Sequence, residues 1–205
     1  SLFIKVSNSI YEELFNIKKF KARVKEIIDY TYDVKGVTFE LIEPNIVEFK
    51  AGQYMQLESP KYEKSKQSVS RAYSISSIPD MKNAVQLIIR RVPDGICTTW
   101  VHDYMKVGDN VNLTGPFGDF FIRDTDADII FVAGGSGKAP IKSMVEFAEK
   151  YENPRKMTYF FGARTLKDLY LTEDFREHEK KMKDFTYVPV LSAPDPDDQW
   201  EGKTG

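Results

Sequence analysis

The first half of the chain, up to about residue 114, alternates apolar and polar residues in short runs. Residues 37–41 (Val-Thr-Phe-Glu-Leu) and 53–57 (Gln-Tyr-Met-Gln-Leu) have a period of two, which turns one side of a strand toward a core and the other toward solvent. Gly52 and Pro60 interrupt these runs, as turn residues do between strands. The pattern predicts an antiparallel sheet or barrel.

The pattern changes after residue 128. Residues 129–133 are continuously apolar, as expected of a strand that is buried on both faces. Further apolar strands are predicted at 157–161 and 185–191, with a charged helix at 172–183 between them. A second helix is predicted behind a proline, with its apolar stripe at helical spacing: Pro140, Ile141, Met144, Val145 and Ala148. Strands that alternate with helices predict a parallel sheet.

The acidic cluster at 124–126 marks this change and divides the chain into two predicted domains, residues 1–123 and residues 124–205. The first is all-β and the second is α/β. A doubly wound parallel sheet normally has about five or six strands. Because the chain supplies three of them, we expect the second domain to be truncated at its C-terminus.

Composition excludes several classes of function. The chain has 41% apolar and 29% charged residues with a formal net charge of -2, which fits a globular protein and gives no field that attracts nucleic acid. Cys97 is the single cysteine, so the chain predicts no disulfide, no zinc site and no iron-sulfur cluster of its own. No apolar run has the length of a membrane helix, and no secretory signal opens the chain. We therefore expect a cytoplasmic protein without a metal ion.

A glycine-rich turn joins the first apolar strand of the second domain to the following helix. Such a turn leaves backbone N–H groups pointing at an anion, and the diphosphate of a dinucleotide suits it. The alternative is a tight turn that binds nothing. A Walker phosphate loop is excluded, because Val132 and Ala139 stand where it needs a glycine and a hydroxyl residue. The predicted site comprises Gly134, Gly135, Gly137 and Pro140.

A second group of candidate residues lies in the β-rich part. Arg71 offers a bidentate, charge-assisted donor for a diphosphate, and Tyr73 offers a flat ring for stacking. Ser74 places a hydroxyl on the opposite face of the same strand. The alternative is an exposed arginine beside a packed tyrosine. More donors follow at Arg90, Gly95 and Thr98, the last two at the start of a short predicted helix.

Four motifs together carry a resemblance to a family: Arg-x-Tyr-Ser at 71–74, Gly-x-x-Thr at 95–98, Gly-Pro-Phe-Gly at 115–118 and Gly-Gly-x-Gly-x-x-Pro at 134–140. In this order and spacing, the chain resembles the ferredoxin-NADP reductase superfamily from about residue 20 to residue 205. Within it, the chain is most similar to the F subunits of sodium-translocating NADH:quinone reductases, through segments 13–19, 115–121, 161–165 and 200–205. The resemblance implies an antiparallel six-stranded FAD-binding β-barrel, followed by the doubly wound nucleotide domain.

The resemblance also implies roles for the candidate residues. Arg71 would bind the FAD diphosphate, Tyr73 would stack on the isoalloxazine and Ser74 would hydrogen-bond near flavin N5, so Tyr73 and Ser74 are the predicted catalytic residues. Arg90, Gly95 and Thr98 would complete the FAD site. NADH would lie across the glycine-rich turn, with three further residues nearby: Gly162, Arg164 and Ser192.

The implied reaction passes a hydride from NADH to FAD and then electrons to an iron-sulfur centre and a quinone. The [2Fe-2S] domain and the membrane subunits would belong to the parent complex, attached to the cytoplasmic face of the inner membrane. Two alternatives stay open: the soluble reductase of a multicomponent oxygenase, and an inactive nucleotide-binding or assembly module. Lys138 occupies a place that is usually apolar in the family, where it either steers phosphate or projects into solvent.

Overall fold

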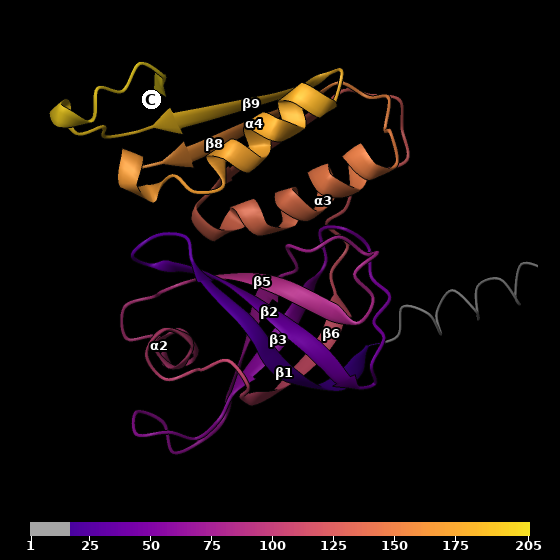
Figure 1. The fold of residues 1–205 in the computed structure, drawn as a ribbon, viewed down its shortest axis with the longest axis vertical. Helices are drawn as coiled ribbons and strands as arrows, with labels where there is room; N and C mark the ends of the chain where they lie inside the picture. Colours follow the sequence, from indigo (N-terminus) through magenta and orange to yellow (C-terminus); the bar gives the residue numbers. More distant parts are fainter. Residues whose placement is uncertain (1–16) are drawn as a thin grey trace, which may run out of the picture.

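The structure, a computed structural model, describes residues 17–205 and contains two sheets. A six-stranded sheet forms the lower body in Figure 1, and a four-stranded parallel sheet with two helices lies above it. Residues 13–16 of the segment that supports the resemblance fall outside the described part of the chain. The predicted fold class, an antiparallel β unit followed by an α/β unit, is confirmed.

The six-stranded sheet is antiparallel and curled. Its strands, in the spatial order β4-β3-β6-β1-β2-β5, are β1 (Lys18–Asp29), β2 (Val34–Glu43), β3 (Tyr54–Ser59), β4 (Val69–Ser74), β5 (Ala84–Arg90) and β6 (Asn110–Phe117). Exposed and buried residues alternate along β1 and β3, as the period of two predicts. The curl brings the two edge strands together, because a bridge between Ile75 and Leu87 links the end of β4 to β5.

The inner face of this sheet holds a core of aliphatic and aromatic side chains. Phe20, Phe39, Met55, Leu57 and Leu113 are among its fully buried members. Burial of side chains of this size contributes about 1.5–3 kcal/mol each. The short helix α2 (Ile96–Asp103) packs against β3 and β4 and contributes Cys97, Trp100 and Val101 to this core. The start of α2 is thereby placed beside β4.

The parallel sheet has the order β10-β9-β8-β7. Its elements are β7 (Ile129–Gly134), a 3₁₀ turn (Gly135–Gly137), α3 (Lys138–Lys150), β8 (Met157–Ala163), a second 3₁₀ turn (Leu166–Asp168), α4 (Thr172–Lys181), β9 (Phe185–Leu191), a third 3₁₀ turn (Pro196–Asp198) and β10 (Lys203–Thr204). The strands and helices at 129–133, 157–161, 172–183 and 185–191 are therefore confirmed to within two residues. The first helix begins two residues before Pro140.

The two helices of the α/β unit, α3 and α4, pack on the same face of this sheet. Their core joins α3 and α4 to alternate strand residues such as Phe131, Tyr159 and Tyr187. The neighbours on β7 point the other way, and Ile130 and Val132 are 69% and 75% exposed. The prediction that 129–133 is buried on both faces was therefore wrong, because the described helices cover one face alone.

Helix α3 lies between the two sheets (Figure 1). Its apolar stripe, including Ile141 and Met144, joins one core with Ala51 and Ile88 of the antiparallel unit. The buried Ser143 hydroxyl donates to the Ser77 carbonyl at 2.6 Å. These contacts fix the position of the helix that follows the glycine-rich turn relative to the antiparallel unit.

Candidate functional site

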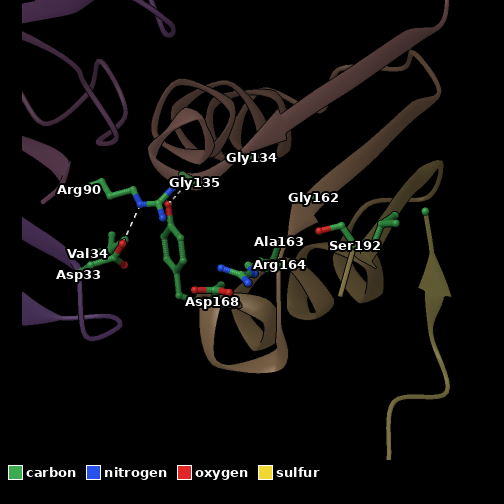
Figure 2. A pocket seen from close by; sticks show the side chains of 13 residues that line it. Asp33, Val34, Arg90, Gly134, Gly135, Gly162, Ala163, Arg164, Asp168 and Ser192 are labelled. Atoms are coloured by element: carbon green, nitrogen blue, oxygen red, sulfur yellow. Dashed lines mark hydrogen bonds and ion pairs between the residues drawn. The ribbon is translucent and has the colours of Figure 1, made fainter. Parts of the chain in front are cut away.

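A cleft of about 390 Å³ opens at the carboxyl ends of β7, β8 and β9. Side chains from both units line it (Figure 2). Asp33, Val34 and Arg90 come from the antiparallel unit, and the other lining residues come from the α/β unit. Ligands of open parallel sheets bind outside the carboxyl ends of the strands. The cleft is therefore the candidate nucleotide site.

The glycine-rich turn forms one wall of the cleft. Gly134 ends β7 beside Gly162 at the same level of β8, so no side chain blocks the approach to the strand ends. Gly135 has φ +54°, and a Cβ atom there would lie 3.2 Å from Arg90 Nη1. The turn leads directly into α3, and no side chain caps the start of that helix. Free N–H groups at such a helix start suit an anion.

Most of the residues predicted for the nucleotide site meet in this cleft. Five line it: Gly134, Gly135, Gly162, Arg164 and Ser192. Two other predicted residues do not. Gly137 is the last residue of the 3₁₀ turn, and Pro140 is buried in the first turn of α3. Both residues belong to the connection from β7 to α3, but neither lines the cleft.

Arg90 bridges the two units. It was predicted for the flavin site, but it lines this cleft beside Gly135. Its Nε donates to Asp33 Oδ2 at 2.7 Å, and the side chain is half exposed. Figure 2 shows the Arg90 guanidinium next to Gly135, with Asp33 joined to it by a dashed line. The guanidinium is thus held where it meets a ligand of the α/β unit.

Asp168 is a cleft residue that sequence reasoning missed. Its Oδ2 accepts from the Thr165 amide and hydroxyl, each at 2.9 Å, and its Oδ1 accepts from the Tyr32 hydroxyl at 2.8 Å. Burial opposes ionisation of this carboxyl, but the hydrogen bonds from Thr165 and Tyr32 outweigh it and lower its pKa. Asp168 therefore puts a fixed negative charge in the cleft. Its spacing of three from Thr165, a capping box, is the signal that pointed to it.

Tyr170 is the second missed residue. Its hydroxyl donates to the Gly135 carbonyl at 2.7 Å, and its ring stacks on Tyr30 with centroids 5.4 Å apart. Burial raises the pKa of its hydroxyl, so this group stays protonated and donates. Tyr170 thereby connects the glycine-rich turn to the β1–β2 turn of the antiparallel unit. No local pattern in the sequence predicts such a long-range contact.

Lys138 neither projects into solvent nor reaches into the cleft. Its side chain is 0% exposed, and Nζ donates to the Tyr170 carbonyl at 2.5 Å and to the Tyr187 hydroxyl at 3.0 Å. Nζ also lies 3.7 Å from the centroid of the Phe161 ring. Burial lowers the pKa of Lys138 to about 7, while Asp174 opposes this shift from a distance. The predicted projection into solvent was therefore wrong, and Nζ has no direct contact with the cleft.

The residues of the Arg-x-Tyr-Ser motif lie on β4. Arg71 and Tyr73 pair with Leu57 and Met55 of β3, and Ser74 points to the opposite face of the strand. Arg71 is exposed, and its Nη1 donates to the Ser70 carbonyl at 2.8 Å, which leaves donors for a ligand. The Tyr73 hydroxyl oxygen is buried and has no hydrogen-bond partner among the described residues. An orphaned polar atom of this kind fits a site that a polar cofactor completes.

The start of α2 completes this second group. Gly95 is the residue before the helix, and a Cβ atom there would lie 2.5 Å from Thr98 Oγ1. The Thr98 hydroxyl is held within the loop, on the carbonyls of Gly95 and Val92 at 3.2 and 3.3 Å. Thr98 thus shapes the turn, and the uncapped N–H groups of α2 lie beside the strand that carries Arg71. Arginine, tyrosine and helix start together fit a bound FAD diphosphate.

Comparison with known proteins finds two family models along the chain. A model of the oxidoreductase FAD-binding domain matches residues 21–122, and a model of the oxidoreductase NAD-binding domain matches residues 131–205. The chain belongs to the ferredoxin reductase family. Its FAD-binding and NAD-binding domains confirm the predicted cofactors, FAD and NADH.

Two kinds of relative share its sequence. The phenol hydroxylase P5 protein of Acinetobacter pittii is 39% identical over 190 residues, which cover 92% of this chain and 52% of that protein. The F subunit of the Na(+)-translocating NADH-quinone reductase of Serratia proteamaculans is 31% identical over 230 residues, covering 95% and 56%. This chain therefore spans about half the length of the curated relatives that it matches.

Solved structures with the same fold include two reductases. The Amycolatopsis cytochrome P450 reductase GcoB has a TM-score of 0.82 at 31% identity, covering 93% of this chain and 56% of that one. The ferredoxin reductase in carbazole 1,9a-dioxygenase has a TM-score of 0.80 at 27% identity, covering 92% and 54%. Within residues 17–205, no cluster of three or more His, Cys, Asp and Glu side chains has the arrangement of a metal site. No described helix has the length and hydropathy needed to span a bilayer.

Proposed function

We propose that this chain is the module through which a hydride passes from NADH to bound FAD, and from which electrons leave singly to an iron-sulfur centre. The observation that carries the proposal is the shared cleft: Arg90 and Asp33 of the FAD-binding domain face the glycine-rich turn of the NAD-binding domain. A nucleotide bound to the NAD-binding domain in this cleft would therefore also contact the FAD-binding domain. FAD, once bound, supplies the step between two-electron and one-electron chemistry.

In this proposal the flavin site lies along β4 and the start of α2. Arg71 binds the diphosphate together with the N–H groups behind Gly95, while Thr98 keeps the turn in shape. Tyr73 presents its ring and its orphaned hydroxyl to the cofactor. Ser74, on the other face of β4, is the proposed hydrogen-bond partner near the flavin N5 atom. These roles orient the cofactor, and orientation of the reacting atoms lowers the barrier to hydride transfer.

In the same proposal the nucleotide lies along the residues that line the cleft. Its diphosphate is placed on the glycine-rich turn and the start of α3, with Arg164 and Ser192 near the ends of β8 and β9. The Asp168 carboxylate favours the free 2′-hydroxyl of NADH, because the 2′-phosphate of NADPH would bring like charges together. NADH is therefore the proposed hydride donor.

The type of parent protein has two candidates. The F-subunit type implies delivery of electrons to a quinone in a sodium-translocating membrane complex, in line with the sequence motifs. A specific observation favours the other candidate, the reductase component of an oxygenase. The P5 alignment pairs about 189 residues of this chain (92% of 205) within 190 positions, almost without gaps. The F-subunit alignment spreads about 195 residues (95% of 205) over 230 positions, so F subunits contain segments that this chain lacks.

The direct test is anaerobic mixing of the FAD-loaded chain with NADH. Loss of the oxidised flavin absorbance on NADH, at lower concentration than on NADPH, supports the proposal. If FAD binds and neither nucleotide reduces it, the chain is instead a flavin-binding or assembly module. Supplying separately purified [2Fe-2S] partner proteins of the oxygenase and quinone-reductase types then distinguishes the two parents by which one accepts electrons.

A further inference from the structure

The buried amine of Lys138 belongs to a closed set of hydrogen bonds behind the nucleotide cleft. Nζ donates to the carbonyl of Tyr170, and the hydroxyl of Tyr170 donates to the carbonyl of Gly135. That carbonyl also accepts from the backbone N–H of Lys138. Lys138 therefore hydrogen-bonds both to Tyr170, through Nζ, and to Gly135, through its backbone N–H, and these are the two residues joined by the Tyr170 hydroxyl.

The surroundings of Nζ contain rings and hydroxyl groups, and no carboxylate hydrogen-bonds to it. The four rings within 3.7–5.1 Å are those of Phe161, Tyr170, Phe175 and Tyr187. Such rings attract a cation through their faces, but the attraction only partly offsets the loss of water around a buried ammonium. A methionine or leucine would fill this space without that cost. Packing alone gives no reason for an amine here.

The position of the amine supplies such a reason. Tyr170 and Gly135 line the cleft, and Nζ is separated from the cleft by Tyr170, to whose carbonyl it donates. An anion on the glycine-rich turn would interact with the ammonium through the protein interior, where charges are screened much less than in water. A bound diphosphate would therefore act as the counterion that the folded protein does not itself place beside Lys138.

We propose that Lys138 is a positioning residue for the dinucleotide: its ammonium holds Tyr170 and the Gly135 carbonyl in place, and binding of the diphosphate draws a proton from solvent onto its amine. The inference rests on the proposed function of the cleft and adds a coupling between nucleotide binding and protonation. No bond other than N–H is made, and the buffer supplies the proton.

Other titratable and charged groups lie around Nζ. Burial raises the pKa of Tyr159 and of Tyr170, and it raises that of Tyr187 to about 12, so these hydroxyls are neutral at pH 6–9. Asp174 on α4 acts on Lys138 from a distance as a carboxylate. His178, on the same helix, is paired with Glu149. Burial lowers the pKa of Lys138 itself to about 7.

The test is calorimetric titration of the FAD-loaded chain with ADP-ribose, which carries the diphosphate and undergoes no hydride transfer. Measurements at pH 7.5 in two buffers of different ionisation enthalpy give the number of protons taken up. We expect about half a proton per ADP-ribose for the unchanged chain, and affinity that falls about tenfold between pH 6 and pH 9. Lys138→Met is expected to take up no proton from this site and to bind about tenfold more weakly at pH 6.5.

Two further variants make the result specific. Lys142→Met is the matched control, because Lys142 lies one turn later on α3, paired with Glu146 and outside the cleft. It is expected to behave like the unchanged chain. Tyr170→Phe removes the hydroxyl on Gly135 but keeps Lys138, so it is expected to lose severalfold in affinity while proton uptake remains. This variant also tests the link if Lys138→Met does not fold.

The outcomes separate this inference from the proposed function. If the unchanged chain binds ADP-ribose while Lys138→Met matches it in affinity and proton uptake, the role of Lys138 is overturned and the nucleotide site stands. The same holds if Tyr170→Phe binds as tightly as the unchanged chain. If the unchanged chain neither binds ADP-ribose nor is reduced by NADH, the proposed function fails, and the role of Lys138 fails with it.

Discussion

The hydroxyl of Tyr32 donates a hydrogen bond to Asp168 Oδ1 at 2.8 Å, which joins the β1–β2 turn of the FAD-binding domain to the loop after β8. Tyr32 is 73% exposed, so this bond lies at the open side of the cleft. Asp168 is held from behind by Thr165. Its charge therefore has a fixed place in the candidate nucleotide site, where the proposed function makes it select NADH over NADPH.

Replacing that charge is expected to relax the choice of nucleotide. Asp168→Asn keeps one oxygen that accepts from Thr165, and its NH2 group can donate to the Tyr32 hydroxyl, but it removes the repulsion of a 2′-phosphate. We expect the ratio of NADPH to NADH affinity to rise about tenfold, which corresponds to about 1.4 kcal/mol. Titration with both nucleotides measures it. Asp198→Asn, an acidic residue outside the cleft that accepts from the Leu166 amide, serves as the control. An unchanged ratio in Asp168→Asn would contradict this role.

Arg71 is expected to account for much of the FAD affinity. Arg71→Ala removes a charge-assisted donor to the diphosphate, at a cost of about 1.5–3 kcal/mol in binding free energy. Fluorescence titration with FAD measures the loss. Arg23→Ala removes an exposed arginine of β1 and is expected to leave the titration unchanged. Equal affinities of the two variants would argue that Arg71 does not hold the diphosphate.

A side chain at Gly135 is expected to weaken nucleotide binding because of the space it occupies, in addition to the backbone strain it causes. Gly135→Ala places a Cβ at φ +54° and 3.2 Å from Arg90 Nη1, in the wall of the cleft. The matched control is Gly108→Ala, at φ +95° with nothing within 4 Å of the new Cβ. Both variants should lose about 1 kcal/mol of unfolding free energy. Only Gly135→Ala should also weaken NADH binding severalfold in a titration, and equal nucleotide affinities would refute the assignment.

Lys138 is expected to make stability depend on pH. Its pKa is about 7 in the folded protein, against an ordinary value of 10.5, so the unfolded chain binds more protons between these values. The free energy of unfolding should therefore rise with pH across this window, by at most about 1.4 kcal/mol per pH unit from this group. Below pH 7 both states are protonated and the contribution no longer changes.

Urea unfolding at pH 7, 8 and 9 measures this rise. Lys138→Met should remove it, so the difference between the unchanged protein and this variant should grow with pH. Lys142→Met should follow the unchanged protein. Parallel curves for the unchanged protein and Lys138→Met would show that the amine is not buried among the aromatic rings.

Local patterns predicted the elements of this fold well. Strands such as β9 were predicted within their observed bounds, because alternation and turn residues are local signals. The two-sided burial of β7 was predicted wrongly, since its apolar run does not reveal that α3 and α4 share one face. Burial on a second face depends on what packs there, and a run of apolar residues does not carry that information.

Residues of the candidate site could be predicted only where they belong to a local sequence motif. Glycines and Arg71 stand out because a turn and a charge have local signatures, whereas Tyr170 and Asp168 enter the cleft through contacts with Tyr30 and Tyr32 from far along the chain. Lys138 is the sharpest case. Its place in the sequence suggests a solvent or phosphate contact, and tertiary packing instead encloses it in aromatic rings.

The proposed reaction requires that residues of β4 and α2 form a flavin site. The most direct measurement is the absorbance spectrum of the purified chain titrated with FAD and then separated from free cofactor. The expected result is a yellow protein with one FAD per chain. A protein that stays colourless and retains no flavin after saturating FAD would contradict it.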